Sequence, residues 1–531
     1  MSEAPRPAGY RWWPAAVVLG LAGAALSVIW LVLDTRQDRV VTTGMVLAVS
    51  AFLLLGWACL LSRFPPALRR ALFGLALAAG VVAYTSVEIR GVSGDLVPIL
   101  AFRWSAEPDR LLPVEARVVP PGAAEALVRP EPPAEGSPPF PGPRDFPQFL
   151  GPERRAVVRS VRLARDWVAS PPRVVWRRPI GAGWSGFAVA GGHAYTQEQR
   201  GEDELVVCYE LETGSIVWSH GDPVRYEMVI AGVGPRATPT VTAHRLYALG
   251  ATGILNCLDR QSGRNIWARD VIEDNDGNRP QWGKSCSPLV VGDLVVVSAG
   301  GRPGRSLVAY RAATGEPVWG GGDDRSAYSS PTFARVAGRE QILILNKANV
   351  AAHDPREGTV LWSYPWAHKH PNVAQPLAVG SDRVFVSSGY GMGCALLRID
   401  RDSTDRLAPV LLWRNRNLKA KFTNVVERGG FIYGLDDGIL VCLDVESGER
   451  RWKGGRYGNG QALLVGDLLL VTTERGELVL VEPSPEEHRE LGRFRALVGR
   501  TWATPALSGS RFLWRSDREA ACWELPLSEE S

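Results

Sequence analysis

A repeated spacing places the strongest constraint on how this chain can fold. Five stretches align without gaps, and in each a glycine stands four residues before a tryptophan and a cysteine or alanine stands ten residues before it. Shared spacing at five places indicates one structural unit used repeatedly, so this part of the chain is expected to fold as a repeat array. The aligned stretches are Cys208–Trp218, Cys257–Trp267, Ala309–Trp319, Ala352–Trp362 and Cys442–Trp452.

Each aligned stretch predicts a β-hairpin. The first strand ends near a position that is acidic in four of the five stretches, the second strand ends in the tryptophan, and the glycine between them occupies a tight turn that needs a positive φ. Two further β-like runs precede each hairpin, for example Pro288–Val291 and Leu294–Ser298. The repeating unit is therefore four antiparallel strands. The turn glycines are Gly214, Gly263, Gly315, Gly358 and Gly448.

The distances between tryptophans predict the number of units. Starting at Trp176, the steps of 42, 49, 52, 43, 51 and 39 residues reach Trp452, and a seventh step of 42 reaches Phe494. Units of about 40–45 residues with four strands each are typical of a β-propeller, here with eight blades. Val174–Arg177 is a fourth strand without three before it, and three strand-like runs near the C-terminus lack a fourth. Pairing them would close the ring and remove its open edges.

The N-terminal region, residues 1–90, is predicted to be a membrane anchor. The uncharged stretches at about 14–33, 40–62 and 71–87 have the length of membrane-spanning helices, although the third is short enough to be a buried helix instead. Arg69 and Arg70 lie directly beside a span and favour a cytoplasmic N-terminus. The expected location is therefore a bacterial cytoplasmic (inner) membrane, crossed several times, with the propeller on the periplasmic or extracytoplasmic side.

Proline content indicates the boundary between the linker and the propeller. Residues 91–143 contain a dense run of prolines and are predicted to be a semi-extended linker, which leaves residues 144–531 for the propeller. The fold class is thus all-β, an eight-bladed β-propeller of four-stranded antiparallel blades after a three-helix transmembrane region.

With 60 Lys and Arg against 56 Asp and Glu, the net charge is only +4, which argues against a nucleic-acid partner.

The hairpin motif resembles the PQQ-like repeat family of eight-bladed propellers, whose motif ends A-x-D-x-x-T-G-x-x-x-W. Together with Phe146–Pro152, Trp282–Pro288 and Lys369–Pro376, the sequence is similar to membrane-anchored planctomycete-type members. The family includes quinoprotein alcohol and glucose dehydrogenases and the BamB-type assembly factor, which has no cofactor. The resemblance implies a structural, blade-docking role for the tryptophans Trp176, Trp218, Trp267, Trp319, Trp362, Trp413 and Trp452.

The residues that would support redox chemistry are not evident in the sequence. It contains no adjacent Cys-Cys pair and no C-x-x-C-H haem motif, and it matches no calcium motif of the family. His368 and His370 have no third ligand at a recognisable spacing, so a polar loop between blades is favoured over a metal site. We therefore predict no catalytic, cofactor-binding or metal-binding residue. The alternative is a membrane-bound sugar or alcohol dehydrogenase that uses PQQ with calcium.

The favoured function is a membrane-anchored, non-catalytic scaffold that binds a protein or an envelope ligand. Loops between strands commonly carry function, and aromatic side chains are enriched where proteins bind one another. The same side chains could instead pack against adjacent blades. The predicted interaction surface consists of Trp282, Trp366, His368, His370 and Tyr390.

Overall fold

The computed structural model describes residues 11–33, 35–114, 142, 144–367 and 369–528. These residues form two compact units. The first unit consists of Met1–Ala106 with Val229–Gly232, and the second consists of Glu107–Met228 with Val233–Ser531. Each unit is described by itself.

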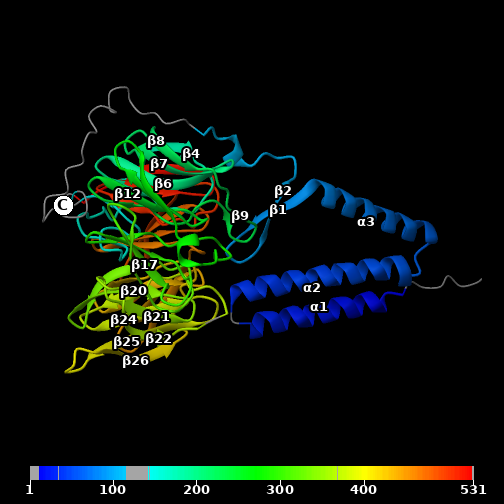
Figure 1. Cartoon of the computed structure of the whole chain (residues 1–531). Helices are drawn as coiled ribbons and strands as arrows, with labels where there is room; N and C mark the ends of the chain where they lie inside the picture. The colour runs from blue at the N-terminus through cyan, green and yellow to red at the C-terminus, as the bar shows by residue number, and fades with distance from the viewer. Residues whose placement is uncertain (1–10, 34, 115–141, 143, 368, 529–531) are drawn as a thin grey trace, which may run out of the picture. The chain divides into compact units, whose positions relative to one another are not determined.

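The first unit contains three long apolar helices, as the sequence predicts. They are α1 (Trp13–Val32), α2 (Arg36–Gly56), which continues into the π-helical turn η1 (Trp57–Leu61), and α3 (Pro66–Ser86) (Figure 1). All three are long and apolar enough to cross a membrane. Helix α3 begins five residues before the predicted third span, because proline is well accommodated in the first turn of a helix.

A two-stranded sheet follows the helices. Strand β1 (Val87–Val92) pairs antiparallel with β2 (Pro98–Phe102), with Val87 opposite Phe102. The segment expected to be a linker, residues 91–143, therefore starts with regular structure. Its proline-rich central part, residues 115–141, lies outside the described residues.

The second unit contains eight sheets of at least four strands, which confirms the eight-bladed propeller. Blades 1 to 4 are β5 (Ala188–Ala190), β6 (His193–Arg200), β7 (Asp203–Glu210) and β8 (Ile216–Asp222); β11 (Thr240–Val241), β12 (Arg245–Leu249), β13 (Ile254–Asp259) and β14 (Asn265–Asp270); β15 (Leu289–Val291), β16 (Leu294–Ser298), β17 (Leu307–Arg311) and β18 (Pro317–Gly321); and β19 (Thr332–Val336), β20 (Arg339–Leu345), β21 (Asn349–His353) and β22 (Val360–Pro365).

Blades 5 to 8 continue the same order of strands. They are β23 (Leu377–Val379), β24 (Arg383–Ser388), β25 (Gly393–Arg401) and β26 (Leu407–Asn415); β27 (Val426–Arg428), β28 (Phe431–Asp436), β29 (Ile439–Asp444) and β30 (Arg450–Arg456); β31 (Ala462–Val465), β32 (Leu468–Thr472), β33 (Glu477–Glu482) and β34 (Arg489–Arg495); and β35 (Ala506–Ser508), β36 (Arg511–Arg515), β37 (Glu519–Glu524) and β4 (Arg173–Pro179). First strands of neighbouring blades contact one another, for example β35 with β5 and β5 with β11, so the first strands surround the propeller axis.

Blade 8 closes the ring as predicted. Strand β4 pairs antiparallel with β37, and Trp176 lies opposite Cys522. In Figure 1 the red C-terminal strands accordingly lie beside β4 and β6 at the beginning of the propeller. Closure pairs strand edges that would otherwise be open to another chain.

The repeat tryptophans contact the next blade at its hairpin turn. The indole Nε1 of Trp218 donates to the carbonyl of Arg260, 3.1 Å away, and the ring covers Gly263. Gly263 has φ +67°, which an L side chain adopts only with strain. The same ring-to-turn contact joins Trp176 with Gly214, Trp267 with Gly315, Trp319 with Gly358 and Trp413 with Gly448. Trp362 differs, because its Nε1 donates to Gln341 of its own blade.

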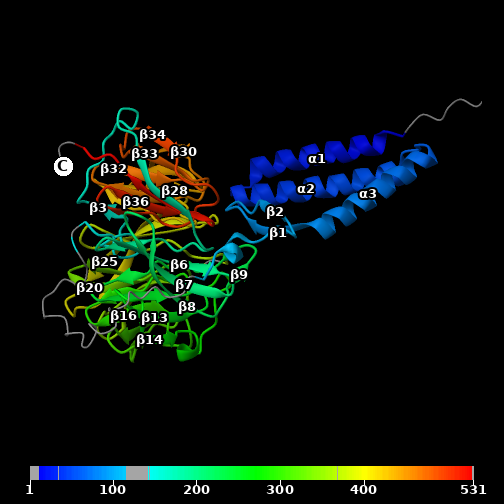
Figure 2. The same cartoon turned by 90° about the horizontal axis from the view of Figure 1, so that it is seen from above.

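The segment 146–158 crosses the propeller axis, an arrangement that the repeat pattern does not predict. Phe146 forms a bridge with Val189 of blade 1, and the carbonyl of Pro147 accepts from the backbone nitrogen of Val241 in blade 2. The segment ends as strand β3 (Val157–Val158), which pairs parallel with β31 and adds a fifth strand to blade 7 (Figure 2).

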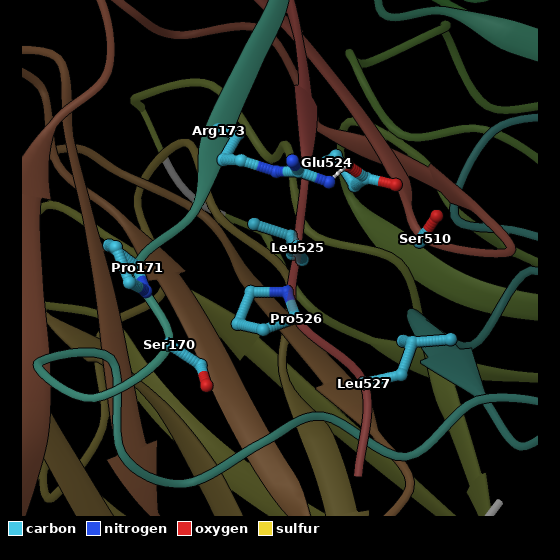
Figure 3. Close-up of a pocket in the computed structure, with 8 residues that line it drawn as sticks. All are labelled: Ser170, Pro171, Arg173, Ser510, Glu524, Leu525, Pro526 and Leu527. Carbon is cyan, nitrogen blue, oxygen red and sulfur yellow. Dashed lines mark hydrogen bonds and ion pairs between the residues drawn. The ribbon is translucent and has the colours of Figure 1, made fainter. Parts of the chain in front are cut away.

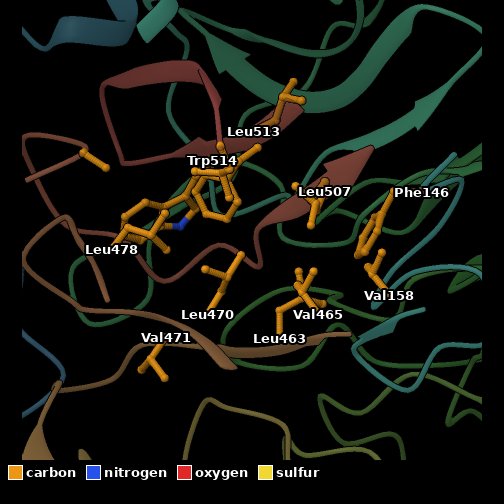
Figure 4. Packing of buried hydrophobic residues seen from close by; sticks show 14 of the residues in the cluster. Phe146, Val158, Leu463, Val465, Leu470, Val471, Leu478, Leu507, Leu513 and Trp514 are labelled. Carbon is orange, nitrogen blue, oxygen red and sulfur yellow. The ribbon is translucent and has the colours of Figure 1, made fainter. Parts of the chain in front are cut away.

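Both ends of the crossing segment are anchored in the core. Figure 4 shows Phe146 and Val158 packed together with Val465 and Leu507 from blades 7 and 8. Phe146 is only 1% exposed. Burial of these side chains fixes the segment against three blades.

An ionic clasp fixes an earlier part of the chain, residues 107–113, to blade 1. Asp109 is 5% exposed, and its Oδ2 lies 2.7 Å from Nη1 of Arg225, which also pairs with Glu107 at 3.1 Å. Nη1 of Arg200 donates to the carbonyl of Pro113 at 2.8 Å. The proline-rich segment is therefore flanked on both sides by residues that are bound to the propeller.

Candidate functional site

The candidate site lies where the fourth strand of one blade leads to the first strand of the next. Aromatic residues recur in these connections, and most of them are half-buried, so their rings are partly available to a ligand. Together with Tyr390, from the turn between β24 and β25, they form the inter-blade aromatic cluster. Its members are Trp184, Trp282, Tyr328, His370, Tyr390, Phe422 and Trp502.

Phe422 is the centre of this cluster. Its ring centroid lies 5.6 Å from Trp502, 6.1 Å from Trp282 and 6.4 Å from Tyr390. Trp282 precedes blade 3 and Phe422 precedes blade 6, so the two loops meet although three blades separate them in the ring. The cluster therefore extends over one end of the propeller axis.

The remaining members extend the cluster outward from Phe422. His370 stacks on Tyr390 with centroids 4.8 Å apart and planes 13° apart. Trp184 lies 4.7 Å from Trp502, and Tyr328 lies 5.2 Å from Trp282. These distances are within the range of favourable aromatic pairs.

Cationic side chains lie against the aromatic rings. Nζ of Lys421 is 5.1 Å from the ring centroids of both Tyr390 and Phe422. The guanidinium of Arg500 is 5.1 Å from the centroids of both Trp184 and Trp502. Cation–π contacts contribute about 0.5–1 kcal/mol when exposed and about 2 kcal/mol when desolvated. Burial lowers the pKa of Arg500, which indicates partial desolvation here.

One member is held rigidly by a carboxylate. Nε1 of Trp502 donates to Oε1 of Glu474 at 3.0 Å, and the side-chain amide of Asn459 donates to Oε2 at 3.2 Å. Fixed aromatic side chains lose little conformational entropy on binding, so they suit a recognition surface.

A second aromatic group lies beside the cluster. The Arg236 guanidinium is 4.5 Å from the centroid of Tyr226, and burial lowers the pKa of Arg236 to about 10. The hydroxyl of Tyr226 donates to the carbonyl of Gln281, next to Trp282. Glu204 affects Arg236 electrostatically, and burial raises the pKa of this carboxyl to about 7.

Three of the five residues predicted as an interaction surface lie together in the cluster: Trp282, His370 and Tyr390. Trp366 does not. Its side chain is fully buried, and its Nε1 donates to Oγ of Ser388 at 2.9 Å, so it packs within the blades. His368 lies outside the described residues.

The sequence interpretation missed Phe422, Trp502, Trp184 and Tyr328. A usable signal was their shared position, because each lies a few residues before the first strand of a blade. Alignment of the hairpin motif alone passes over these connections, since it ends at the tryptophan of the fourth strand.

A belt of polar side chains runs from blade to blade beside the first strands. The backbone nitrogen of Thr238 donates to Oγ of Ser287 at 2.9 Å, and that of Ser287 donates to Oγ of Ser330 at 2.9 Å. The belt continues through Gln375 to Asn424, at 2.6 and 2.9 Å. The first four of these residues precede a proline, which removes a backbone donor and leaves their side chains to link the blades.

A cavity of about 400 Å³ lies at the closure seam of blade 8. Figure 3 shows its eight lining residues, among them Arg173 and Glu524, whose ion pair spans 2.5 Å. Arg173 begins β4, whereas the aromatic cluster follows the other end of this strand, so the two sites are separate. Leucine and proline line much of the cavity, and it contains no cluster of ionisable groups beyond this pair.

Metal and thiol chemistry find little support in the side chains. Within the described parts of the chain, no group of three or more His, Cys, Asp or Glu could hold a metal ion. The seven cysteines are free thiols, and burial raises the pKa of Cys208 and Cys257 to about 12.

The second unit is an eight-bladed β-propeller whose hairpin motif resembles PQQ-like repeats. Residues 202–454 match the family model described as outer membrane protein assembly factor BamB, which confirms the resemblance seen in the hairpin motif. BamB of Shewanella oneidensis is 24% identical over 188 residues, which cover 33% of this chain and 44% of that protein. The match thus spans less than half of the length of this relative.

Solved structures share the fold. BamB from Moraxella catarrhalis matches with a TM-score of 0.50 and 16% identity, over 67% of this chain and all of that one. Quinohemoprotein alcohol dehydrogenase from Comamonas testosteroni matches with a TM-score of 0.51 and 11% identity, over 72% of this chain and 80% of that one. An assembly factor and an oxidoreductase match equally well, so the fold alone does not select a function.

Proposed function

We propose that this chain is a membrane-anchored, extracytoplasmic propeller that binds a protein or an envelope ligand and performs no catalysis. The observation that carries the proposal is the inter-blade aromatic cluster centred on Phe422. Aromatic residues in packed, partly exposed groups dominate the binding energy of many interfaces. No cofactor, metal or catalytic residue is assigned.

The cluster combines the properties that such an interface needs. Trp282, Phe422 and Trp502 are half-buried and come from three different connections, so a ligand over the axis could contact several blades at once. Lys421 adds positive charge beside apolar rings, and Arg500, which pairs with Asp517 at 3.5 Å, lies against Trp502. The surface therefore suits a partner that presents apolar or aromatic groups next to carboxylates.

Site-specific photocrosslinking in cells tests this assignment. A benzophenone amino acid at position 422 should give a discrete adduct, and the variants Trp282→Ala and Trp502→Ala should weaken it at least tenfold. Position 333 is the matched control, because Phe333 is 38% exposed and lies outside the cluster. Equal adducts at both positions, or none at position 422, would contradict the proposal.

The alternative is a PQQ-dependent dehydrogenase, favoured by the structural likeness to the alcohol dehydrogenase from Comamonas testosteroni. Quinone chemistry belongs to the cofactor, so this function requires PQQ and calcium to bind. The full chain in detergent, supplied with both, should show no dye reduction with alcohols or aldoses. Turnover with stoichiometric PQQ would establish the alternative.

A further inference from the structure

The crossing segment places an arginine at the propeller axis. Nη2 of Arg154 donates to the carbonyl of Ser287, a member of the polar belt, at 2.8 Å. The next residue, Arg155, extends toward blade 5, where its Nη2 donates to the carbonyl of Ala378 at 3.2 Å. The guanidinium groups of two consecutive residues thus contact two different blades, Arg154 at the start of blade 3 and Arg155 in blade 5.

Arg154 is buried without a compensating charge. It is 3% exposed, and its Nε and Nη1 have no hydrogen-bond partner. Within the described parts of the chain, no carboxylate forms an ion pair with this side chain. Burial lowers the pKa of Arg154 to about 10, so the group stays protonated at neutral pH. An unpaired charge away from water costs several kcal/mol.

A second buried cation lies near Arg154. Lys284 is 1% exposed, and its Nζ donates to the carbonyls of Ser298 and Ala299 at 3.1 and 2.5 Å. Both cations act on the thiol of Cys286, whose pKa burial raises and these charges lower. The surroundings of Cys286 therefore hold two positive charges, which increases the free energy that an anion would gain there.

The backbone holds Arg154 in place. Arg154 and Ala156 both have φ +54°, a left-handed conformation that is costly for residues other than glycine. Strain of this kind persists where the surrounding structure determines the conformation, and it is common at ligand sites. The strand β3 and the Phe146 anchor provide this constraint on either side.

We propose that Arg154 binds a small inorganic anion at the propeller axis through one of its two unpartnered nitrogens, Nε or Nη1. The anion would supply a missing hydrogen-bond acceptor and the missing negative charge beside this side chain. Charge-assisted hydrogen bonds of this type are about twice as strong as neutral ones. The role is structural and does not depend on the partner of the aromatic cluster.

Thermal unfolding of the full chain in detergent tests the proposal. At constant ionic strength, replacing gluconate by chloride or phosphate should raise Tm saturably by roughly 2 °C or more, because only the folded state has the site. Separate chloride and phosphate titrations distinguish a halide from an oxyanion. Arg154→Met should abolish the rise. The matched control is Arg159→Met, because Arg159 is exposed and pairs with Glu153 on the surface. An equal rise in wild type and Arg154→Met, or no rise in wild type, would overturn the proposal.

A direct measurement decides the matter even if Arg154→Met does not fold. Crystals of the wild-type full chain grown with bromide should show an anomalous peak within about 3.5 Å of the Arg154 guanidinium. For an oxyanion that excludes halides, selenate replaces bromide. Ordered water in place of either probe would mean that the site is hydrated and does not select anions, and the proposal would then be wrong.

Discussion

Trp218 covers Gly263 so closely that a Cβ on residue 263 would lie 2.4 Å from Cε3 of the indole. The glycine comes from the hairpin turn of blade 2 and the tryptophan from the fourth strand of blade 1. The glycine and the tryptophan of one hairpin motif therefore take part in two different contacts, one with the preceding blade and one with the following blade. In five pairs of blades the glycine receives the previous blade's ring and the tryptophan covers the next blade's turn, whereas Trp362 bonds within its own blade.

Gly263→Ala should destabilise the propeller through this contact. The added methyl group must displace the Trp218 ring, and the positive φ adds strain, so we expect a loss of about 2–4 kcal/mol. Gly192→Ala is the matched control, because Gly192 has φ +78° but nothing within 4 Å of the position of a Cβ. Tm followed by tryptophan fluorescence compares the two. Equal losses would show that backbone strain alone is responsible.

Removal of the last strand should open the ring. A chain that stops after Ser516 lacks β37, so β4 loses its partner, β36 keeps only β35, and both strands expose an unpaired edge. We expect this variant to aggregate on size-exclusion chromatography in detergent. A chain that stops after Ser528 keeps β37 and serves as control. A monodisperse protein without β37 would contradict a stabilising role for closure.

Stability should depend on pH through Glu204. This residue is 3% exposed, its Oε2 accepts from the backbone nitrogen of Ala251 at 3.0 Å, and burial raises its pKa from 4.5 to about 7. Between these two values the folded state binds more protons than the unfolded state. Stability is therefore lost as pH rises from 4.5 to 7, and the loss is complete above pH 7.

Glu204→Gln removes this titration and keeps an oxygen for Ala251. Relative to wild type, the variant should gain up to about 3 kcal/mol at pH 8 and nothing at pH 4.5. Tm measured across this range reports the difference. Glu487→Gln, at an exposed position, is the control. A gain that is the same at both pH values would show that ionisation of Glu204 is not the cause.

The membrane topology is tested with reporter fusions. The cluster of Arg69 and Arg70 at the start of α3 favours a cytoplasmic position for this turn, so three spans would place residue 105 outside the cytoplasm. Alkaline phosphatase fused after residue 105 should be active, and the same fusion after residue 64 should be inactive. The opposite pattern would place the propeller in the cytoplasm.

The propeller could be predicted because its signal is periodic. Hairpin spacing defines the blades, and the unmatched strands at both ends of the chain, Val174–Arg177 among them, predict the closure. The pattern is visible in the sequence because most blades repeat the same contact with their neighbour. The additional strand β3 has no counterpart in other blades, so no repeat could predict it.

The candidate site was only partly predictable because it depends on side-chain direction and on contacts across the axis. Trp282 and Phe422 are far apart in sequence, and no spacing relates them. Trp366 lies in the same connection as His370, yet its indole is buried between the blades and is not available to a ligand. Sequence shows that an aromatic residue lies in a loop, whereas the packing of neighbouring blades determines which side of the loop it occupies.

The clasp between Asp109 and Arg225 changes what proteolysis would do to this molecule. A cut anywhere in residues 115–141 would break the covalent link between the membrane helices and the blades, yet residues 107–113 would still be bound to blade 1. Attachment would then depend on ion pairs and hydrogen bonds, which high salt weakens. A nicked protein would stay with the membrane fraction in dilute buffer and release its propeller in concentrated salt.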